Sequence, residues 1–275
     1  MSAEEEWDVD SLDLDAYLRR IGHEGPRTAT AATLTAVHRA HKESVGFGNV
    51  DVFLGREVPL GTRDLQRKLV DARRGGYCFE HNLLFAAALE RLGFRVTRLL
   101  ARVRQGRPTV RYRAHTVLLV TLGDTRMLAD VGFGDEGLIE PVPLVAGARA
   151  EVGKWSWQVA AEGDQWVLRS LHDDGWFDLY AFREEHHHFV DFEVSHHYTA
   201  HSPRSTFVGK LIAMRGTEER RSLLRGLEFT TRSPGGPTER VQLTPEELPR
   251  VLLETFLIEL SAEEKNSLRL LFAAS

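Results

Sequence analysis

The chain has one cysteine among 275 residues, in the stretch RRGGYCFEHN, residues 73–82. Cys78 follows Gly75-Gly76-Tyr77 and precedes residues with the apolar pattern of a helix. A thiol at the start of a helix lies near unpaired backbone N–H groups and the positive end of the helix dipole, which stabilise the nucleophilic thiolate. Gly75 and Gly76 leave the approach to the sulfur free of side chains and allow a tight turn. The alternative is that Cys78 is a small buried hydrophobic residue.

A nucleophilic thiol needs a base, and the base needs a group that orients it. His115 begins the apolar stretch HTVLLV, and Asp130 lies near the end of the next apolar stretch, before VGFG. Their separation suits an antiparallel hairpin that turns at Gly123-Asp124 and places the two side chains next to each other. The pattern predicts a triad of Cys78, His115 and Asp130. A structural histidine and an aspartate that binds turn N–H groups would give the same sequence.

The composition is that of a soluble globular protein, with 42% hydrophobic and 27% charged residues. A single cysteine forms no internal disulfide, and the acidic start MSAEEEWDVD has no signal-peptide pattern, so we expect a cytoplasmic protein. No apolar run reaches the ~18 residues that cross a bilayer. The net charge of −5, with both signs mixed along the chain, does not favour nucleic acid as a partner.

Three regions differ in their residue patterns, and we expect an α+β multidomain fold. Residues 1–92 have helical apolar spacing and predict a helical bundle that carries the nucleophile. Residues 93–200 predict an antiparallel β-barrel that carries the histidine and aspartate, and residues 201–275 predict an α/β lid. Strands are expected over residues 94–103, 112–122, 127–131, 154–161, 165–171, 176–182, 206–214, 228–232 and 240–243.

Local signals predict where two helices end or begin. Gly93 is expected to end the helix that follows Cys78, because glycine is the common residue just beyond a helix C-terminus. A C-terminal helix is expected to begin at Thr244, where Thr-Pro-Glu-Glu supplies an N-cap residue, a proline in the first turn and a glutamate at the third helical position.

Three separated motifs carry a resemblance to a known family. The stretches Arg74–Asn82, His115–Val120 and Asp130–Gly134 resemble the signature segments of the arylamine N-acetyltransferases. Phe47-Gly48-Asn49-Val50-Asp51 is similar to the family's Phe-Glu-Asn-Leu-Asp segment, with glycine in place of the glutamate. Pro203–Phe207 resembles the Pro-x-Ser-x-Phe segment at the entry to the family's third domain. The resemblance implies a helical bundle, a β-barrel and an α/β lid.

The resemblance also implies a ping-pong reaction. Cys78 would take an acetyl group from acetyl-CoA, a cosubstrate, and pass it to the nitrogen of an arylamine, arylhydrazine or arylhydroxylamine. His115 would carry protons, and Asp130 would hold His115. Backbone N–H groups at the start of the Cys78 helix are candidates for the oxyanion site.

Four residues are candidates for substrate binding. The resemblance puts Phe47 and Phe133 against the ring of the acceptor. Gly132 lies beside Phe133 in the expected turn, and Tyr77 is next to the thiol in the sequence. Aromatic side chains at such positions can equally belong to the core.

The sequence also contains clusters of histidines and arginines that could bind a metal or a cofactor. His186-His187-His188 and His196-His197 could suggest a metal, but neighbouring strand residues point to opposite faces and no further cysteine is present. No P-loop and no Gly-x-Gly-x-x-Gly motif follows a strand. We expect no metal and no bound prosthetic group. The Arg102, Arg104 and Arg107 group could meet an anionic cofactor or form solvated surface.

Other functions fit the same triad. An amide synthase would close a macrolactam from a carrier-bound acyl chain, a cysteine hydrolase would use water, and a binding module would leave Cys78 unreactive. The expected partners are a small aromatic amine or hydrazine and an acyl-CoA, with no nucleic acid and no membrane. The sequence leaves the oligomeric state and the preferred acyl group open.

Overall fold

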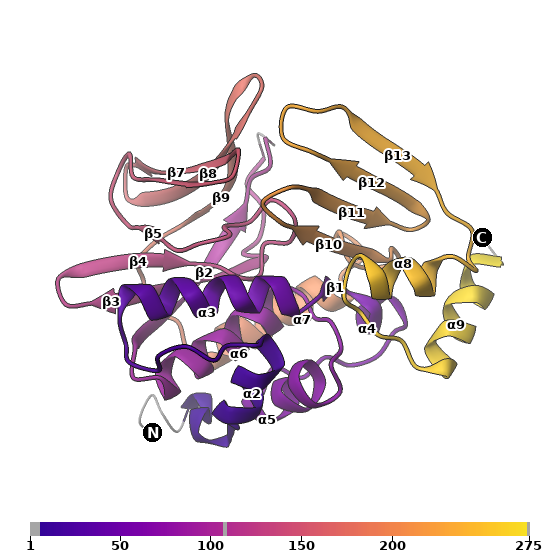
Figure 1. Cartoon of the computed structure of the whole chain (residues 1–275), viewed down its shortest axis with the longest axis horizontal. Helices are drawn as coiled ribbons and strands as arrows, with labels where there is room; N and C mark the ends of the chain where they lie inside the picture. The colour runs from indigo at the N-terminus through magenta and orange to yellow at the C-terminus, as the bar shows by residue number, and fades with distance from the viewer. Residues whose placement is uncertain (1–5, 107–108, 274–275) are drawn as a thin grey trace.

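The computed structural model describes residues 6–106 and 109–273. Figure 1 shows a layer of helices beneath a curled sheet, with a second sheet and the C-terminal helices to one side. The helices are η1 (Val9–Ser11), α2 (Leu14–Ile21), α3 (Ala31–Ser44), α4 (Val50–Phe53), α5 (Thr62–Leu65), η2 (Gln66–Asp71), α6 (Cys78–Arg91), α7 (Phe189–His201), α8 (Leu248–Glu254) and α9 (Ala262–Ala273). Within the described residues, no helix is both long and apolar enough to cross a membrane.

Helix α6 is the centre of the helical layer. It is buried from Cys78 to Leu89, including the polar residues Glu80, His81 and Asn82 of its first turns. It packs against η1, α2 and α5 on one side and against strands β2 (Arg95–Val103) and β3 (His115–Leu122) on the other. The nucleophile candidate therefore begins a helix that is enclosed by both layers.

Within the described residues, eight antiparallel strands form the sheet above the helices, in the order β5-β4-β3-β2-β9-β8-β7-β6. The sheet curls into a nearly closed barrel (Figure 1). The strands not yet named are β4 (Thr125–Ala129), β5 (Val142–Pro143), β6 (Arg149–Val152), β7 (Trp155–Glu162), β8 (Gln165–His172) and β9 (Gly175–Phe182). Buried and partly exposed positions alternate at the start of β7, as in a strand with one face on a core.

The β3–β4 hairpin brings the two β-strand candidates together. Leu122 pairs with Thr125, and Gly123 makes the turn in the left-handed region at φ 57°. His115 is the first residue of β3, and Asp130 directly follows the last residue of β4. The expected hairpin is confirmed.

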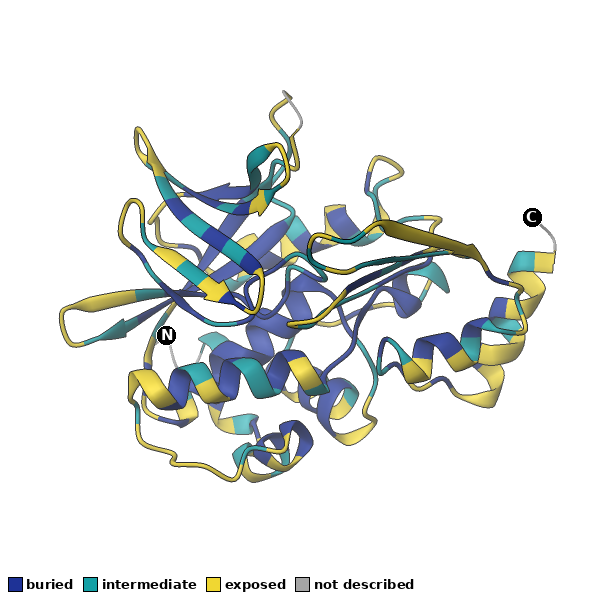
Figure 2. Cartoon of the chain, turned by 45° about the horizontal axis from the view of Figure 1, so that its top comes forward, coloured by how far each residue is buried: buried dark blue, intermediate teal, exposed yellow. Residues whose placement is uncertain are grey.

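The second sheet has the order β1-β10-β11-β12-β13 within the described chain. Its strands are β1 (Phe47–Gly48), β10 (Ile212–Gly216), β11 (Arg221–Arg225), β12 (Glu228–Arg232) and β13 (Thr238–Gln242). The outer strand β13 is exposed at every position (Figure 2). The short strand β1 comes from the helical region and pairs with β10, so residues far apart in the sequence share this sheet.

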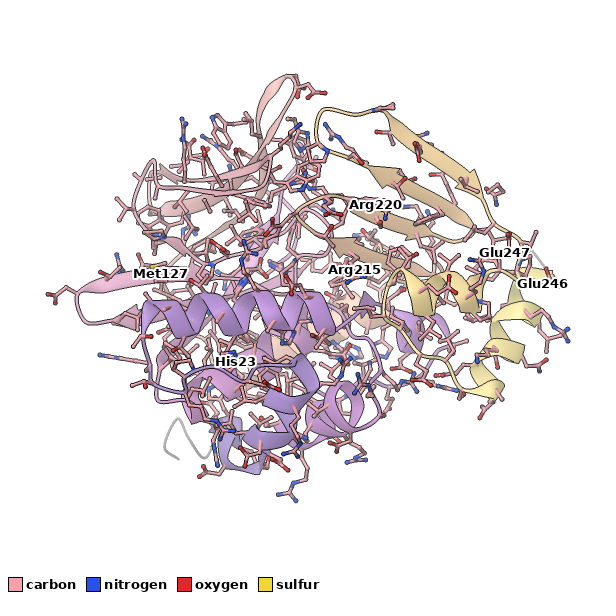
Figure 3. All side chains as sticks on the ribbon, viewed as in Figure 1. His23, Met127, Arg215, Arg220, Glu246 and Glu247 are labelled. Atoms are coloured by element: carbon pink, nitrogen blue, oxygen red, sulfur yellow. The ribbon has the colours of Figure 1, made fainter. Side chains whose placement is uncertain are left out.

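Two residues explain how the second sheet meets the helices. Arg215, labelled in Figure 3, donates to the carbonyls of Thr255 at 3.2 Å and Glu43 at 3.3 Å. A Cβ atom on Gly48 would lie 2.5 Å from Cδ1 of Ile258 and 3.2 Å from the carbonyl oxygen of Ile212, so a larger residue here would require the Ile258 side chain to move. Glycine at this position lets the strand approach the C-terminal region closely.

The expected α+β class with a barrel is confirmed, and several details differ. Helix α7 was not expected; the carboxylate of Asp191 accepts from the N–H of His188 at 2.9 Å and starts it. Residues 206–211 are not a strand. The C-terminal region holds two helices, and α8 begins at Leu248, because the Thr244 N–H bond to Glu247 at 2.8 Å closes a turn before the helix. The domain division at residues 92 and 200 stays a prediction.

Candidate active site

Cys78 is the first residue of α6 and is buried, with 4% of the residue exposed. The N–H of Tyr77 donates to Oε2 of Glu80 at 3.1 Å, which satisfies a free donor at the helix start. The other oxygen of Glu80 pairs with the ammonium of Lys68 at 2.5 Å. The thiol donates to the carbonyl of Ala114 at 3.4 Å, so it contacts the residue that precedes His115.

His115 and Asp130 form a buried pair. Nε2 of His115 lies 2.8 Å from Oδ2 of Asp130, and both side chains are almost fully buried. The imidazole is enclosed by the rings of Phe133 at 5.0 Å and Tyr180 at 4.9 Å between centroids. Because an ionised carboxylate only accepts, Nε2 carries the proton and Nδ1 is left as a base.

The environment of Asp130 keeps its carboxylate ionised. Burial alone would raise its pKa, but the charge of His115 and the hydrogen bond from it act in the opposite direction. Nδ2 of Asn82 and the N–H of Gly132 each donate to Oδ1 at 2.9 Å. Together these groups hold the pKa of Asp130 below its usual range.

For the Cys78 thiol, in contrast to Asp130, the surroundings favour the neutral form. Burial raises the pKa of Cys78, and the charge of Asp130 acts in the same direction. The N–H groups of Phe79 and Cys78 lower it, as expected at a helix start, but burial is the larger effect. The helix start therefore favours the thiolate, as expected, but it does not outweigh burial. Proton transfer from Cys78 to His115 avoids this cost in part, because the three groups carry one negative charge before and after it.

His38 supports the aspartate from behind. Its Nδ1 lies 2.9 Å from the carbonyl of Ile139, and its Nε2 accepts the N–H of Asp130 at 3.2 Å. Only a neutral ring with the proton on Nδ1 satisfies both contacts. Burial, and then the charge of Lys42, lower the pKa of His38 to about 3.

A pocket of about 90 Å³ opens onto the thiol. Four sequence candidates line it beside Cys78: His115, Phe47, Gly132 and Phe133. Asp130 lies behind His115. Tyr77 also lies behind the pocket, fully buried, with its hydroxyl hydrogen-bonded to Nδ1 of His196. The remaining described residues of the lining are Val103, Gln105, Arg111, Tyr112, Ala114, Thr206, Phe207, Met214 and Arg225.

Asn49 explains how Phe207 reaches this pocket. Nδ2 of Asn49 donates to the carbonyls of Phe207 and Lys210, each at 2.8 Å, and its Oδ1 accepts the N–H of Ile212 at 2.7 Å. One side chain therefore holds both ends of the segment that leads into β10. Its place in the Phe-Gly-Asn motif was the signal in the sequence, although its partners could not be predicted.

Gly75 and Gly76, which precede Tyr77 and Cys78, lie where the chain packs closely against other segments. A Cβ on Gly75 would lie 2.8 Å from the carbonyl oxygen of Gly46, and one on Gly76 would lie 2.9 Å from Cδ2 of Leu69. Neither glycine lines the described pocket. The expectation that they clear the approach to the sulfur is wrong; they allow the chain to pass β1 at close range, with Gly48 N–H bonded to Gly76 O at 2.7 Å.

Comparisons with known proteins identify the family of this chain. The family model described as N-acetyltransferase matches residues 30–265. The arylamine N-acetyltransferase of Escherichia coli (strain K12) is 36% identical over 232 residues, which cover 84% of this chain and 83% of that protein. The chain belongs to the arylamine N-acetyltransferase family. It is therefore an acyltransferase.

Solved structures of the family have the same fold. The Nocardia farcinica arylamine N-acetyltransferase superposes with a TM-score of 0.90 at 40% identity, covering 98% of this chain and 97% of that one. The Mycobacterium marinum arylamine N-acetyltransferase in complex with CoA has a TM-score of 0.88 at 33% identity and covers 94% of this chain and 98% of its own.

Two further sequence observations concern ligands. Among residues 6–106 and 109–273, no group of three or more His, Cys, Asp or Glu side chains is arranged to hold a metal ion. Of the arginines that could meet an anion, Arg107 lies outside the described residues, whereas Arg102 and Arg104 line a cavity on the barrel.

Proposed function

We propose that this acyltransferase moves an acetyl group from acetyl-CoA to the nitrogen of an arylamine, arylhydrazine or arylhydroxylamine. Cys78 is the acyl carrier, His115 transfers protons and Asp130 orients His115. One observation carries the proposal: the His115 Nε2 to Asp130 Oδ2 contact of 2.8 Å leaves Nδ1 as a base in the pocket that holds the only thiol.

In the first half-reaction the Cys78 thiol gives its proton to Nδ1 of His115 and attacks the thioester carbonyl. The N–H groups at the start of α6 are placed to stabilise the oxyanion, since those of Phe79 and Cys78 already act on the sulfur. The C–S bond to CoA then breaks, and the imidazolium returns the proton to the CoA thiolate. The products are free CoA and acetyl-Cys78.

In the second half-reaction the amine nitrogen attacks the acetyl carbon of the acylated enzyme. Nδ1 of His115 takes a proton from the nitrogen, and the bond between carbon and Sγ breaks. The Cys78 thiolate recovers the proton from His115. A thioester is converted to an amide, so this step runs downhill, and no metal or redox group is needed for the balance.

The pocket suits an aromatic acceptor. The rings of Phe47, Phe133 and Phe207 and the side chain of Met214 give it apolar walls. Such walls bury an arene and exclude the water that would hydrolyse the acetyl-enzyme. We propose Phe47, Phe133 and Gly132 as substrate contacts, and for Tyr77 a role in holding the start of α6 through His196.

The competing activities are less well supported. The macrolactam alternative has less support, because the E. coli relative carries the name arylamine N-acetyltransferase. The test is CoA release from acetyl-CoA with and without an aromatic amine, with the product identified by mass. We expect steady turnover only with the amine, and an N-acetylated product. Equal release without the amine would establish a hydrolase instead, and Cys78→Ala is the control for background chemistry.

A further inference from the structure

Two side chains of α3 hold the loop that follows β4. His38 and Lys42 are four residues apart, which places them on the same face of the helix. His38 contacts both ends of the loop, through the N–H of Asp130 at 3.2 Å and the carbonyl of Ile139 at 2.9 Å. Lys42 contacts its middle, since Nζ donates to the carbonyl oxygen of Gly134 at 3.0 Å. One turn of α3 therefore holds the loop at its beginning, its middle and its end.

The amine of Lys42 lies in an environment that disfavours a charge. The residue is buried, with 9% of it exposed. Burial lowers the pKa of Lys42 to about 8, and the carboxylates of Asp130 and Asp135 oppose this shift. An apolar side chain of similar length would avoid the cost of burying a charge, but it would not donate to the carbonyl of Gly134. What the amine adds at this position is the hydrogen bond to the loop.

The residue before Gly134 is a wall of the catalytic pocket. Phe133 lines the pocket, and its ring packs against the imidazole of His115 at 5.0 Å between centroids. The loop is tightly folded at this point, because a Cβ on Gly137 would lie 2.8 Å from Cβ of Phe133 and 3.4 Å from Nζ of Lys42. The amine and the aromatic ring therefore lie on the same short turn of chain, and a shift of this turn would move the ring.

The geometry points to Lys42 as a positioning residue for the acceptor: by holding Gly134 it sets the place of the Phe133 ring in the pocket, and so the fit of an aromatic amine. This inference rests on the proposed function, in which Phe133 contacts the ring of the acceptor. Asp130 keeps its separate contact with Asn82, so acetylation of the enzyme should depend little on Lys42. The effect of Lys42 should therefore be confined to acceptors that have a ring.

The test compares two acceptors on the full chain: aniline, which has an aromatic ring, and hydrazine, which has none. Lys42→Met keeps the length of the side chain and removes the donor. We expect kcat/KM for aniline to fall about 10-fold in this variant, because a displaced wall fits the ring less well. The value for hydrazine and the rate of acetylation of Cys78 by acetyl-CoA should stay within about 2-fold of wild type. Because both acceptors are measured on the same variant, a misfolded fraction cancels from their ratio.

Matched variants separate the hydrogen bond from general packing. Lys42→Arg keeps a cationic donor and should recover part of the preference for aniline over hydrazine. Lys265→Met is the same change at an exposed position of α9 and should leave the preference at its wild-type value. In a Phe133→Ala background, Lys42→Met should have little further effect on aniline, because the ring through which Lys42 acts is then absent.

The inference is overturned if Lys42→Met changes kcat/KM for the two acceptors by the same factor. It is also overturned if the loss with aniline is as large in the Phe133→Ala background, since Lys42 then acts independently of that ring.

Hydrogen exchange of the loop, residues 131–138, needs no turnover and so separates the two proposals. If the wild-type chain acetylates no amine, the proposed function fails. Faster exchange of this loop in Lys42→Met than in the wild-type chain, with residues 79–89 of α6 unchanged, would then still support the role of Lys42. Unchanged exchange of the loop would overturn it.

Discussion

Nδ2 of Asn82 donates to Oδ1 of Asp130 at 2.9 Å, while His115 occupies the other oxygen of the same carboxylate. The amide also donates to the carbonyl of Thr116 at 2.6 Å and accepts the N–H of Val131 at 3.0 Å. One side chain on α6 therefore fixes both strands of the hairpin relative to the helix that begins with the thiol.

Replacement of Asn82 by alanine should weaken both folding and catalysis. It leaves the N–H of Val131 and the carbonyl of Thr116 without partners in a dry site, at a cost of about 1–3 kcal/mol in the free energy of unfolding. The rate of acetylation of Cys78 should fall as well, because Asp130 loses a donor. Urea denaturation and rapid-quench acetylation measure the two effects. Asn266→Ala, an exposed change on α9, is the control, and equal stability of the two variants would contradict this role.

Asp130→Asn should damage the rate far more than the fold. An amide at this position can donate to Nε2, which favours the imidazole tautomer with its proton on Nδ1 and removes the base. We expect a loss in kcat/KM of about 10³-fold or more, by analogy with the equivalent change in other triads. Asp135→Asn, a change of the same type in the same loop, should retain most of the activity. Comparable activity of the two variants would refute the role of Asp130.

Gly132→Ala tests the close approach between the loop after β4 and the start of α6. A Cβ there would lie 2.8 Å from the carbonyl oxygen of Cys78 and 2.7 Å from Nδ2 of Asn82. Backbone at this distance has to move, so activity and melting temperature should both fall. Gly61→Ala, whose new atom would lie 3.4 Å from Oδ2 of Asp64, should be tolerated. Full activity of Gly132→Ala would show that the loop has room to shift.

His38 should make the folded state sensitive to acid. Its pKa is lowered to about 3, from 6.5, so below pH 6.5 the unfolded chain binds a proton that the folded chain does not. Stability should therefore fall as the pH drops from about 6.5 toward 3, by about 1.4 kcal/mol per pH unit from this group. Urea denaturation between about pH 6 and pH 4.5 should show a smaller slope for His38→Gln than for the wild-type chain. The exposed His197→Gln should keep the wild-type slope; an identical slope for His38→Gln would contradict the prediction.

Much of the fold follows from local patterns in the sequence. The hairpin that carries His115 and Asp130 was predictable because two stretches rich in apolar residues flank a turn signal at Gly123-Asp124, and its register depends on nearby residues. The helix after Cys78 was predictable because Leu83, Leu84, Ala87, Ala88 and Leu92 have helical spacing up to Gly93, which adopts φ 88°.

The missing parts depend on contacts between distant segments. Phe207 and Met214 reach the pocket because β1 pairs with β10, with Phe47 opposite Met214, and no local pattern specifies that pairing. His38 meets Asp130 across 92 residues in the same way. The position of Cys78 at a helix start could be predicted from the sequence, whereas the burial that raises the pKa of its thiol could not.

The central claim is that Cys78 carries the acetyl group, and intact mass spectrometry tests it directly. The protein is mixed with acetyl-CoA alone, measured, digested to locate the adduct, and then treated with an aromatic amine. We predict one acetyl group on Cys78 that the amine removes as the N-acetylated product, and no such adduct in Cys78→Ala. Acetylation elsewhere in the chain with full turnover, or turnover that survives Cys78→Ala, would contradict the account.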